Sequence, residues 1–182
     1  MMNTTKIIIL LCFLSLLATA CFKEPNYADT PAIAFESIRN VPINNGSDSV
    51  IITIAYQDGD GDMGLSSTDT MPPFQRLVSG QPNQFYNNYF LNIYKKVRGS
   101  YVPVRFVEPS FTLNGRYPRL NGSRKSAIEG TLKYSFVFFY VFSNAYTPSI
   151  SRNDTVKFDV QVVDRALNKS NIVETQEIII GR

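Results

Sequence analysis

Three aspartates recur at every second position in residues 56–64, which read Tyr-Gln-Asp-Gly-Asp-Gly-Asp-Met-Gly. The glycines between them permit a tight bend, so the carboxylates of Asp58, Asp60 and Asp62 can converge on one point. Carboxylates held this close repel one another, and a hard cation with oxygen ligands relieves the repulsion. The spacing therefore predicts that this loop binds calcium. Mg²⁺ suits it less well, because that ion demands a stricter octahedron.

The acidic loop differs from the helix-flanked calcium loop of an EF-hand. With Asp58 as position one, Gly64 offers a backbone carbonyl at position seven and Asp69 occupies position twelve. Met63 stands where the EF-hand has an invariant glycine, and position twelve is usually a bidentate Glu. A strand pattern precedes the loop, so we expect a calcium-type loop on a β-domain. Asp-Gly repeats also form ordinary turns, and the sequence leaves that alternative open.

Two further segments carry side chains that could contact a ligand. The stretch 66–88 contains Phe74, Phe85 and Tyr86, which could stack on a sugar or a peptide or fold back over the core. The insertion 108–130 places Arg116 beside Tyr117, where they could contact an anionic polysaccharide or phosphates of a membrane surface. Scattered cations also form an ordinary solvated face, so both alternatives remain.

Composition excludes several classes of function. The chain has no His, which removes the usual general base, the usual zinc ligand and any Ser-His triad. Its formal net charge of +3 is too small for a nucleic-acid-binding surface. The chain contains two cysteines, Cys12 and Cys21, which build no disulfide framework. We therefore expect a domain that is stabilised by packing and does not bind nucleic acid.

The elements that position these residues read as β-strands. Thirteen Phe and ten Tyr, with many Val and Ile, fit pleated sheets. Gly99-Ser100 predicts a hairpin turn, and Pro103 in the return strand predicts a sheet edge. No stretch sustains a helical period, so the sequence predicts an all-β, immunoglobulin-like antiparallel β-sandwich of about seven strands with two long loop insertions. Alternation marks strands at 50–56, 89–93, 101–106, 132–142 and 156–162, and a last strand passes through Ile172 and Ile178.

This fold predicts a second contribution to the calcium site. In an immunoglobulin-like sandwich, the loop after the second strand and the loop before the last strand emerge at the same end. If 50–56 is the second strand and 156–162 the penultimate one, the turn 164–170 lies beside the acidic loop. Asp164 and Asn168 would then complete the ligand set. The full predicted set is Asp58, Asp60, Asp62, Gly64, Asp69, Asp164 and Asn168.

The N-terminus has the three parts of a secretory signal peptide. Lys6 precedes an apolar run at 7–17, and the small residues Ala18-Thr19-Ala20 lead to Cys21. This ending resembles the lipobox of bacterial lipoproteins, in which the Cys is lipidated and becomes the mature N-terminus. Ala18 stands where that family usually has Leu. The alternatives are an ordinary secreted protein and an N-terminal anchor.

The lipobox, the acidic loop and the closing segment 163–171 together resemble a family of Bacteroidetes lipoproteins with an immunoglobulin-like domain. The resemblance implies a signal peptide at 1–20, a tether at 21–31 and a β-sandwich domain at 32–182. It also implies export and lipid anchoring at Cys21 to the cell envelope, at the outer membrane. What it implies is a location and a fold, and not an activity.

The combined observations predict a lipid-anchored, non-enzymatic binding or structural module of the cell envelope, stabilised by calcium. Its partner would be a glycan or another envelope protein, besides the membrane itself. The alternative is a small glycoside-type hydrolase that uses a carboxylate pair such as Asp58 and Asp164. A concave pocket holding a carboxylate of raised pKa would favour the hydrolase, whereas an exposed aromatic or polar platform would favour binding.

Overall fold

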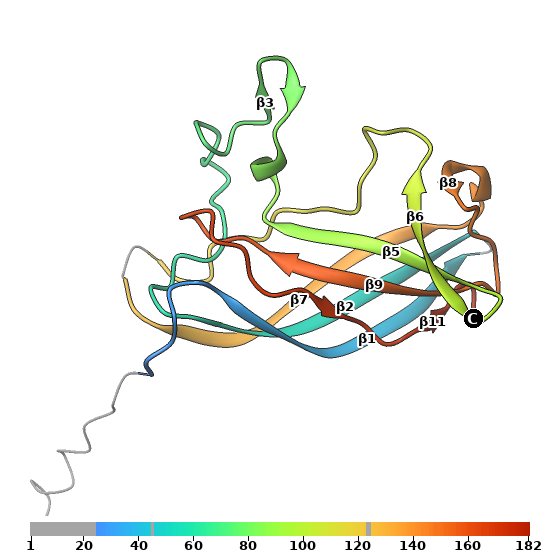
Figure 1. Ribbon diagram of the computed structural model, residues 1–182, viewed down its shortest axis with the longest axis horizontal. Coiled ribbons are helices and arrows are strands. Elements are labelled where there is room, and N and C mark those ends of the chain that lie inside the picture. Colours follow the sequence, from blue (N-terminus) through green and yellow to red (C-terminus); the bar gives the residue numbers. More distant parts are fainter. Residues whose placement is uncertain (1–24, 45, 123–124) are drawn as a thin grey trace, which may run out of the picture.

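The computed structural model describes residues 25–44, 46–122 and 125–182 (Figure 1). The predicted signal peptide, Cys21 and the first residues of the predicted tether lie outside this range. Among the described residues, no helix is long and apolar enough to cross a membrane. The strands are β1 (Ala32–Asn44), β2 (Ser47–Asp58), β3 (Leu77–Val78), β4 (Gln81–Pro82), β5 (Tyr89–Val97), β6 (Ser100–Phe106), β7 (Ile128–Phe139), β8 (Tyr146–Thr147), β9 (Thr155–Val162), β10 (Val173–Glu174) and β11 (Ile178–Ile179), and the short 3₁₀ helices are η1 (Gln84–Tyr86) and η2 (Ser143–Ala145).

The domain is an all-β sandwich, as predicted. One sheet has the order β1-β2-β7, and the other has the order β10-β9-β5-β6-β8, with β11 also paired to β9. All pairings in both sheets are antiparallel. The long strands β1, β2 and β7 share one sheet, and β5, β6 and β9 share the other. In chain order, the first, second and fifth long strands are thus in one sheet and the third, fourth and sixth in the other, which is immunoglobulin-like connectivity. Counting β10 and β11 as one interrupted strand, eight strands build the two sheets, and one of them is the two-residue β8.

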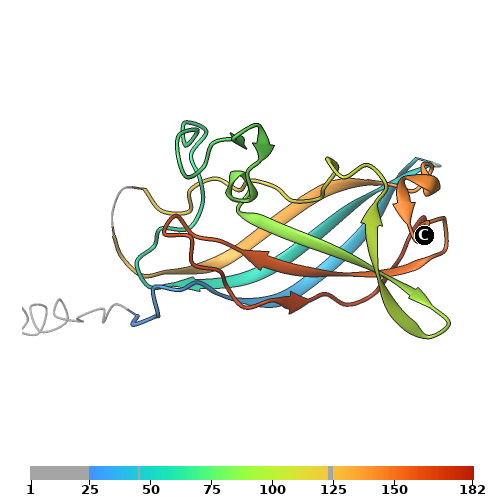
Figure 2. The same ribbon diagram turned by 45° about the horizontal axis from the view of Figure 1, so that its top comes forward.

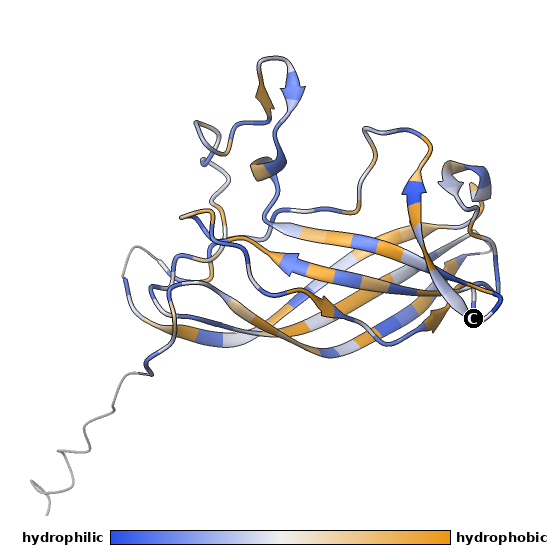
Figure 3. Cartoon of the chain, viewed as in Figure 1, coloured by the Kyte–Doolittle hydropathy of each residue, from blue (hydrophilic) through white to orange (hydrophobic). Residues whose placement is uncertain are grey.

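The core lies between the sheets because each strand turns one apolar row inward. Val50, Ile52 and Ile54 of β2 are fully buried, and β9 alternates a buried position with a half-buried one along its whole length. The same alternation appears as orange and blue bands along β5 and β9 in Figure 3. Phe138 of β7 meets Phe158 of β9 edge to face, with ring centroids 6.5 Å apart. Alternation with a period of two is typical of an antiparallel strand that buries one face.

Several local expectations need correction. The hairpin turn between β5 and β6 is Arg98-Gly99 and not Gly99-Ser100, because Ser100 already pairs with Val97. Arg98 and Gly99 have φ values of 51° and 87°, and the favoured two-residue hairpin turn needs positive φ at both positions. β8 lies outside β6 in the sheet, but within the described chain it pairs with β6 at Arg105 and Phe106 alone, so Pro103 has no outer partner, as an edge position requires.

Three other strands also differ from the expectation. β1 is a thirteen-residue strand that the alternation did not reveal, because a register shift after Phe35 interrupts its period. β7 lies at the edge of its sheet and ends at Phe139, so Phe142 of the predicted strand 132–142 lies beyond it and is 59% exposed. The last strand is split into β10 and β11 by Thr175, whose hydroxyl accepts the Phe158 N–H. Ile172 lies outside both pieces and is exposed.

The two insertions follow β2 and β6. The first carries the β3–β4 hairpin and η1 and extends away from the sandwich (Figure 1). The second runs across the base of the first, where the Arg116 guanidinium donates to the carbonyls of Ser66, Asp69 and Tyr86. These bonds tie the long loop to the sandwich at the end that carries the acidic residues.

Candidate metal centre

The acidic loop and the turn after β9 lie side by side at one end of the sandwich, in both views of the ribbon (Figures 1 and 2). Asp58 is the last residue of β2, and the loop that follows forms a bridge from Met63 to Asp164. The Arg165 N–H also donates to Asp62 Oδ1, at 3.3 Å. The two turns are therefore neighbours, as the topology predicted.

Three carboxylates from these two turns meet. One oxygen from each of Asp58, Asp62 and Asp164 lies within 4.8 Å of the other two. Asp58 is 0% exposed and Asp164 is 1% exposed, while Asp62 is partly buried. Oxygen ligands at this separation match the demand of a hard divalent cation.

Asp58 is the most unusual member of this cluster. Neither of its carboxylate oxygens has a hydrogen-bond partner of normal geometry within the described part of the chain, and Asp60 Oδ1 is also buried without one. A buried carboxylate without a partner carries a large desolvation penalty. Asp58 therefore needs either a proton or a cation in order to remain in this position.

The pKa values of the cluster move in the direction that this burial dictates. Burial, and then the charges of Asp60, Asp62 and Asp164, raise the pKa of Asp58 to about 7, although the Met63 N–H acts in the opposite direction. Burial also raises the pKa of Asp62, as does the charge of Asp60. Burial raises the pKa of Asp164 against two opposing hydrogen bonds from Asn168. Without a cation, burial and mutual repulsion therefore favour the protonated form of each of these carboxyl groups.

The other predicted ligands lie around this group in different roles. Asn168 donates its backbone N–H to one oxygen of Asp164 and its side-chain N–H to the other, at 2.7 and 2.9 Å, so it orients that carboxylate. The Asp69 carboxylate pairs with the Arg165 guanidinium and accepts the Ser66 N–H. Gly64 has a φ of 91° and lies against the backbone of Pro118 and Arg119.

Tyr117 borders the metal centre, a position that the sequence did not indicate. Its ring is buried and its hydroxyl has no partner among the described residues. Burial, followed by the charges of Asp58 and Asp164, raises the pKa of this phenol. The Tyr117 carbonyl accepts the Leu65 N–H, which fixes the far end of the acidic loop. No signal in the sequence distinguishes Tyr117 from the other loop aromatics.

The remaining candidate ligand-binding residues divide into structural and surface positions. Phe74 is buried beneath the Arg165 guanidinium, whose carbon lies 5.6 Å from the ring centroid. Arg116 lies over the Tyr86 ring at 4.8 Å while it donates to three carbonyls. Phe85 is half-buried and lines a surface pocket. Of these residues, only Phe85 faces a space that could hold a ligand.

Comparisons with known proteins add no assignment: no family model matches the chain, and no curated protein or solved structure does either.

Proposed function

We propose that this protein is a calcium-stabilised, non-enzymatic binding module that a lipid at Cys21 anchors to a bacterial cell envelope. The observation that carries the calcium assignment is the Asp58 carboxylate, which is fully buried and has no hydrogen-bond partner of normal geometry among the described residues. Asp62 and Asp164 supply two more carboxylates to the same point. Ca²⁺ accepts six to eight oxygen ligands in flexible geometry, so backbone carbonyls and waters can complete such a set.

The acidic cluster supports a structural role for the ion. Its members come from the end of β2, the loop that follows it and the turn after β9, and β2 and β9 belong to different sheets. An ion bound there would link the two sheets at one end of the sandwich. It would also remove the mutual repulsion of carboxylates that burial leaves poorly screened.

A hydrolase that uses Asp58 and Asp164 has less support. Both carboxylates are almost fully buried, so a glycosidic bond would have little access to them. Three surface pockets of the described chain are lined by other residues. A general acid must reach the leaving oxygen of its substrate within hydrogen-bond distance. The raised pKa of Asp58 follows from its burial beside other carboxylates, a position that suits a metal ligand better than a general acid.

The test is thermal melting of the purified protein in calcium and in chelator, with the affinity measured by calorimetry. We expect weak binding of the extracellular kind, with a dissociation constant on the order of 10⁻⁴–10⁻³ M. Calcium at about 100 times that constant should add roughly 2.7 kcal/mol of stability. Asp58→Asn and Asp164→Asn should each abolish the gain, because each removes a converging charge.

Asp69→Asn is the matched control, since Asp69 belongs to the same loop but pairs with Arg165. It should keep the response to calcium even if its basal stability falls. Identical melting of the wild type in calcium and in chelator would reduce the loop to an ordinary turn. If Asp69→Asn alone lost the stabilisation by calcium, the calcium site could not be the one formed by Asp58 and Asp164.

A further inference from the structure

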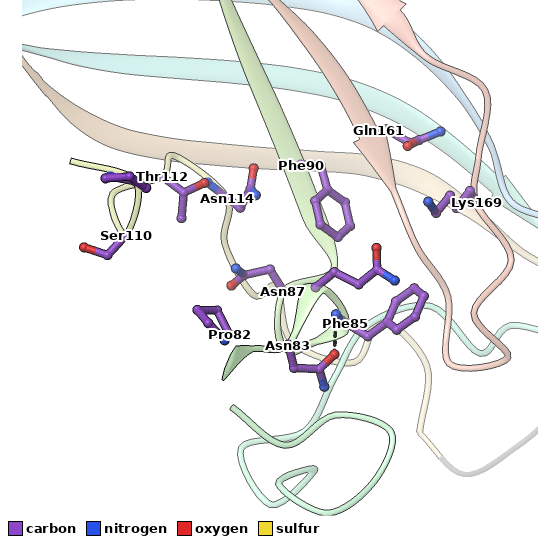
Figure 4. A pocket seen from close by; sticks show the side chains of 12 residues that line it. Pro82, Asn83, Phe85, Asn87, Phe90, Ser110, Thr112, Asn114, Gln161 and Lys169 are labelled. Atoms are coloured by element: carbon purple, nitrogen blue, oxygen red, sulfur yellow. Dashed lines mark hydrogen bonds between the residues drawn. The ribbon is translucent and has the colours of Figure 1, made fainter. Parts of the chain in front are cut away.

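A polar pocket lies on the surface near the metal centre, between the first insertion, the second insertion and the end of β9 (Figure 4). Its volume is about 410 Å³, within the range of small-molecule sites. In Figure 4, Ser110 and Thr112 lie on one side and Gln161 and Lys169 on the other, with Phe90 between them. The pocket thus collects residues from four separate segments of the chain.

The lining of this pocket is dominated by carboxamides. Five of them come from Asn83, Gln84, Asn87, Asn114 and Gln161. Each carboxamide offers both a donor and an acceptor, which is what a hydroxyl group needs, because a hydroxyl also donates and accepts. No carboxylate lines the pocket, and Lys169 is its single charged residue. The absence of carboxylates disfavours a cation, a single lysine offers few contacts to a polyanion, and the amides favour a neutral, hydroxyl-rich ligand.

Some of these amides are fixed by the fold and others are free to bind. Asn83 accepts the Phe85 N–H and donates to the carbonyls of Pro73 and Gln75, and Asn114 accepts the Leu91 N–H. Within the described part of the chain, the Gln84 and Asn87 side chains make no hydrogen bond. The pocket therefore has a pre-formed wall, which lowers the entropic cost of binding, and unpaired polar groups that can contact a ligand.

Two aromatic rings complete the arrangement. Phe85 and Phe90 are both half-buried, so each keeps part of its surface exposed at the pocket. An aromatic face packs well against the apolar C–H face of a pyranose ring, while the amides contact the hydroxyl rim. A neighbouring pocket of about 390 Å³ shares Pro109, Thr112 and Asn114 with the first. The two pockets therefore lie next to each other on the surface.

We infer that this pocket is a saccharide-binding site, with Phe85 and Phe90 as stacking platforms and Gln84 and Asn87 as hydroxyl-binding groups. The inference rests on the proposed binding function and names its ligand class. Calcium is not required for the assignment, because the pocket and the acidic cluster are lined by different residues.

The test is binding of the purified full chain, in excess calcium, to an array of immobilised neutral and uronic-acid hexasaccharides, followed by calorimetry on the tightest ligand. We expect a neutral hexasaccharide to bind. Phe90→Leu keeps apolar volume but removes the ring, and it should weaken binding about tenfold. Asn87→Ala should weaken binding at least severalfold. Phe142→Ala and Asn144→Ala are the matched controls, since both residues are exposed and lie outside the pocket lining, and both variants should bind as the wild type does.

Three outcomes would overturn the inference: no glycan bound above background, equal affinity in Phe90→Leu and the wild type, or loss of binding only in Lys169→Ala, which would mean that the site recognises charge. Melting in calcium and in chelator is measured on the same preparations. If calcium stabilises the domain but no glycan binds, the saccharide site is refuted and the metal assignment stands. If glycan binds but calcium does not change the melting temperature, the metal assignment is refuted and the saccharide site stands.

Discussion

At the scale of single residues, the acidic loop depends on glycines as much as on carboxylates. Gly61 has a φ of 69°, a left-handed conformation that side chains rarely adopt, and a Cβ on it would overlap the Ser126 carbonyl oxygen. Gly59 donates its N–H to the Ala28 carbonyl at 2.8 Å. The loop is therefore packed between the start of the described chain and the second insertion. This packing holds Asp58 and Asp62 close together before any ion binds.

Gly61→Ala should destabilise the domain by about 1–3 kcal/mol more than Gly80→Ala does, because it adds overpacking to backbone strain. Gly80 is a matched control: it has a φ of 78°, and a Cβ there would meet nothing within 4 Å. Urea denaturation of both variants in chelator measures the difference. Equal losses would mean that the loop is not packed against Ser126.

At the scale of elements, the strands follow the alternation of the sequence, but their places in the sheets do not. The segment 132–142 has the richest apolar pattern of the predicted β-domain, and yet β7 forms an edge. Leu132 and Phe138 still turn inward to the core, whereas Val137 and Phe139 are exposed on the other face. An edge strand can be essential to the core, because burial depends on which face points inward and not on the order of strands.

Phe138→Ala should cost about 3–5 kcal/mol, since its ring is fully buried against Phe158 and Tyr146. Phe136→Ala should cost less, because Phe136 is only half-buried. Phe142→Ala, at an exposed position, should stay within about 0.5 kcal/mol of the wild type. Chemical denaturation ranks the three variants. A loss below roughly 1 kcal/mol for Phe138→Ala would be incompatible with this packing.

At the scale of the whole molecule, the acidic end of the sandwich is also the end at which the described chain begins. Ala28 contacts Gly59, and the Tyr27 hydroxyl donates to the Glu129 carboxylate. Seven residues join Cys21 to Ala28, which is at most about 25 Å of extended chain. A lipid at Cys21 would therefore hold the metal centre close to the membrane surface.

Cys21→Ser should abolish lipidation, so the protein should be released or remain unprocessed. One acyl chain anchors a protein only marginally, and stable attachment needs several chains on that Cys. Membrane fractionation of the wild type and the variant, combined with their electrophoretic sizes, measures both effects. A variant that stays with the membrane at its mature size would disprove the lipid anchor.

The sequence by itself determined the β class, the inward faces of β2 and β9, and the three-aspartate loop. Those features are local: a period of two assigns side chains to faces, and Gly-Asp repeats build a bend wherever they occur. Topology then allowed the neighbourhood of residues 58–64 and 164–170 to be predicted, because the connectivity of the sandwich gathers those loops at one end.

The tertiary structure alone decided which of the candidate groups meet. Arg165 pairs with Asp69, ninety-six positions away in the chain, and thereby engages one predicted ligand. Tyr117 lies at the edge of the acidic cluster, and amides from three separate segments line the surface pocket. Of that pocket lining, the sequence had indicated Phe85 and none of the amides. Contacts of this kind depend on packing between distant segments, and local periodicity carries no information about them.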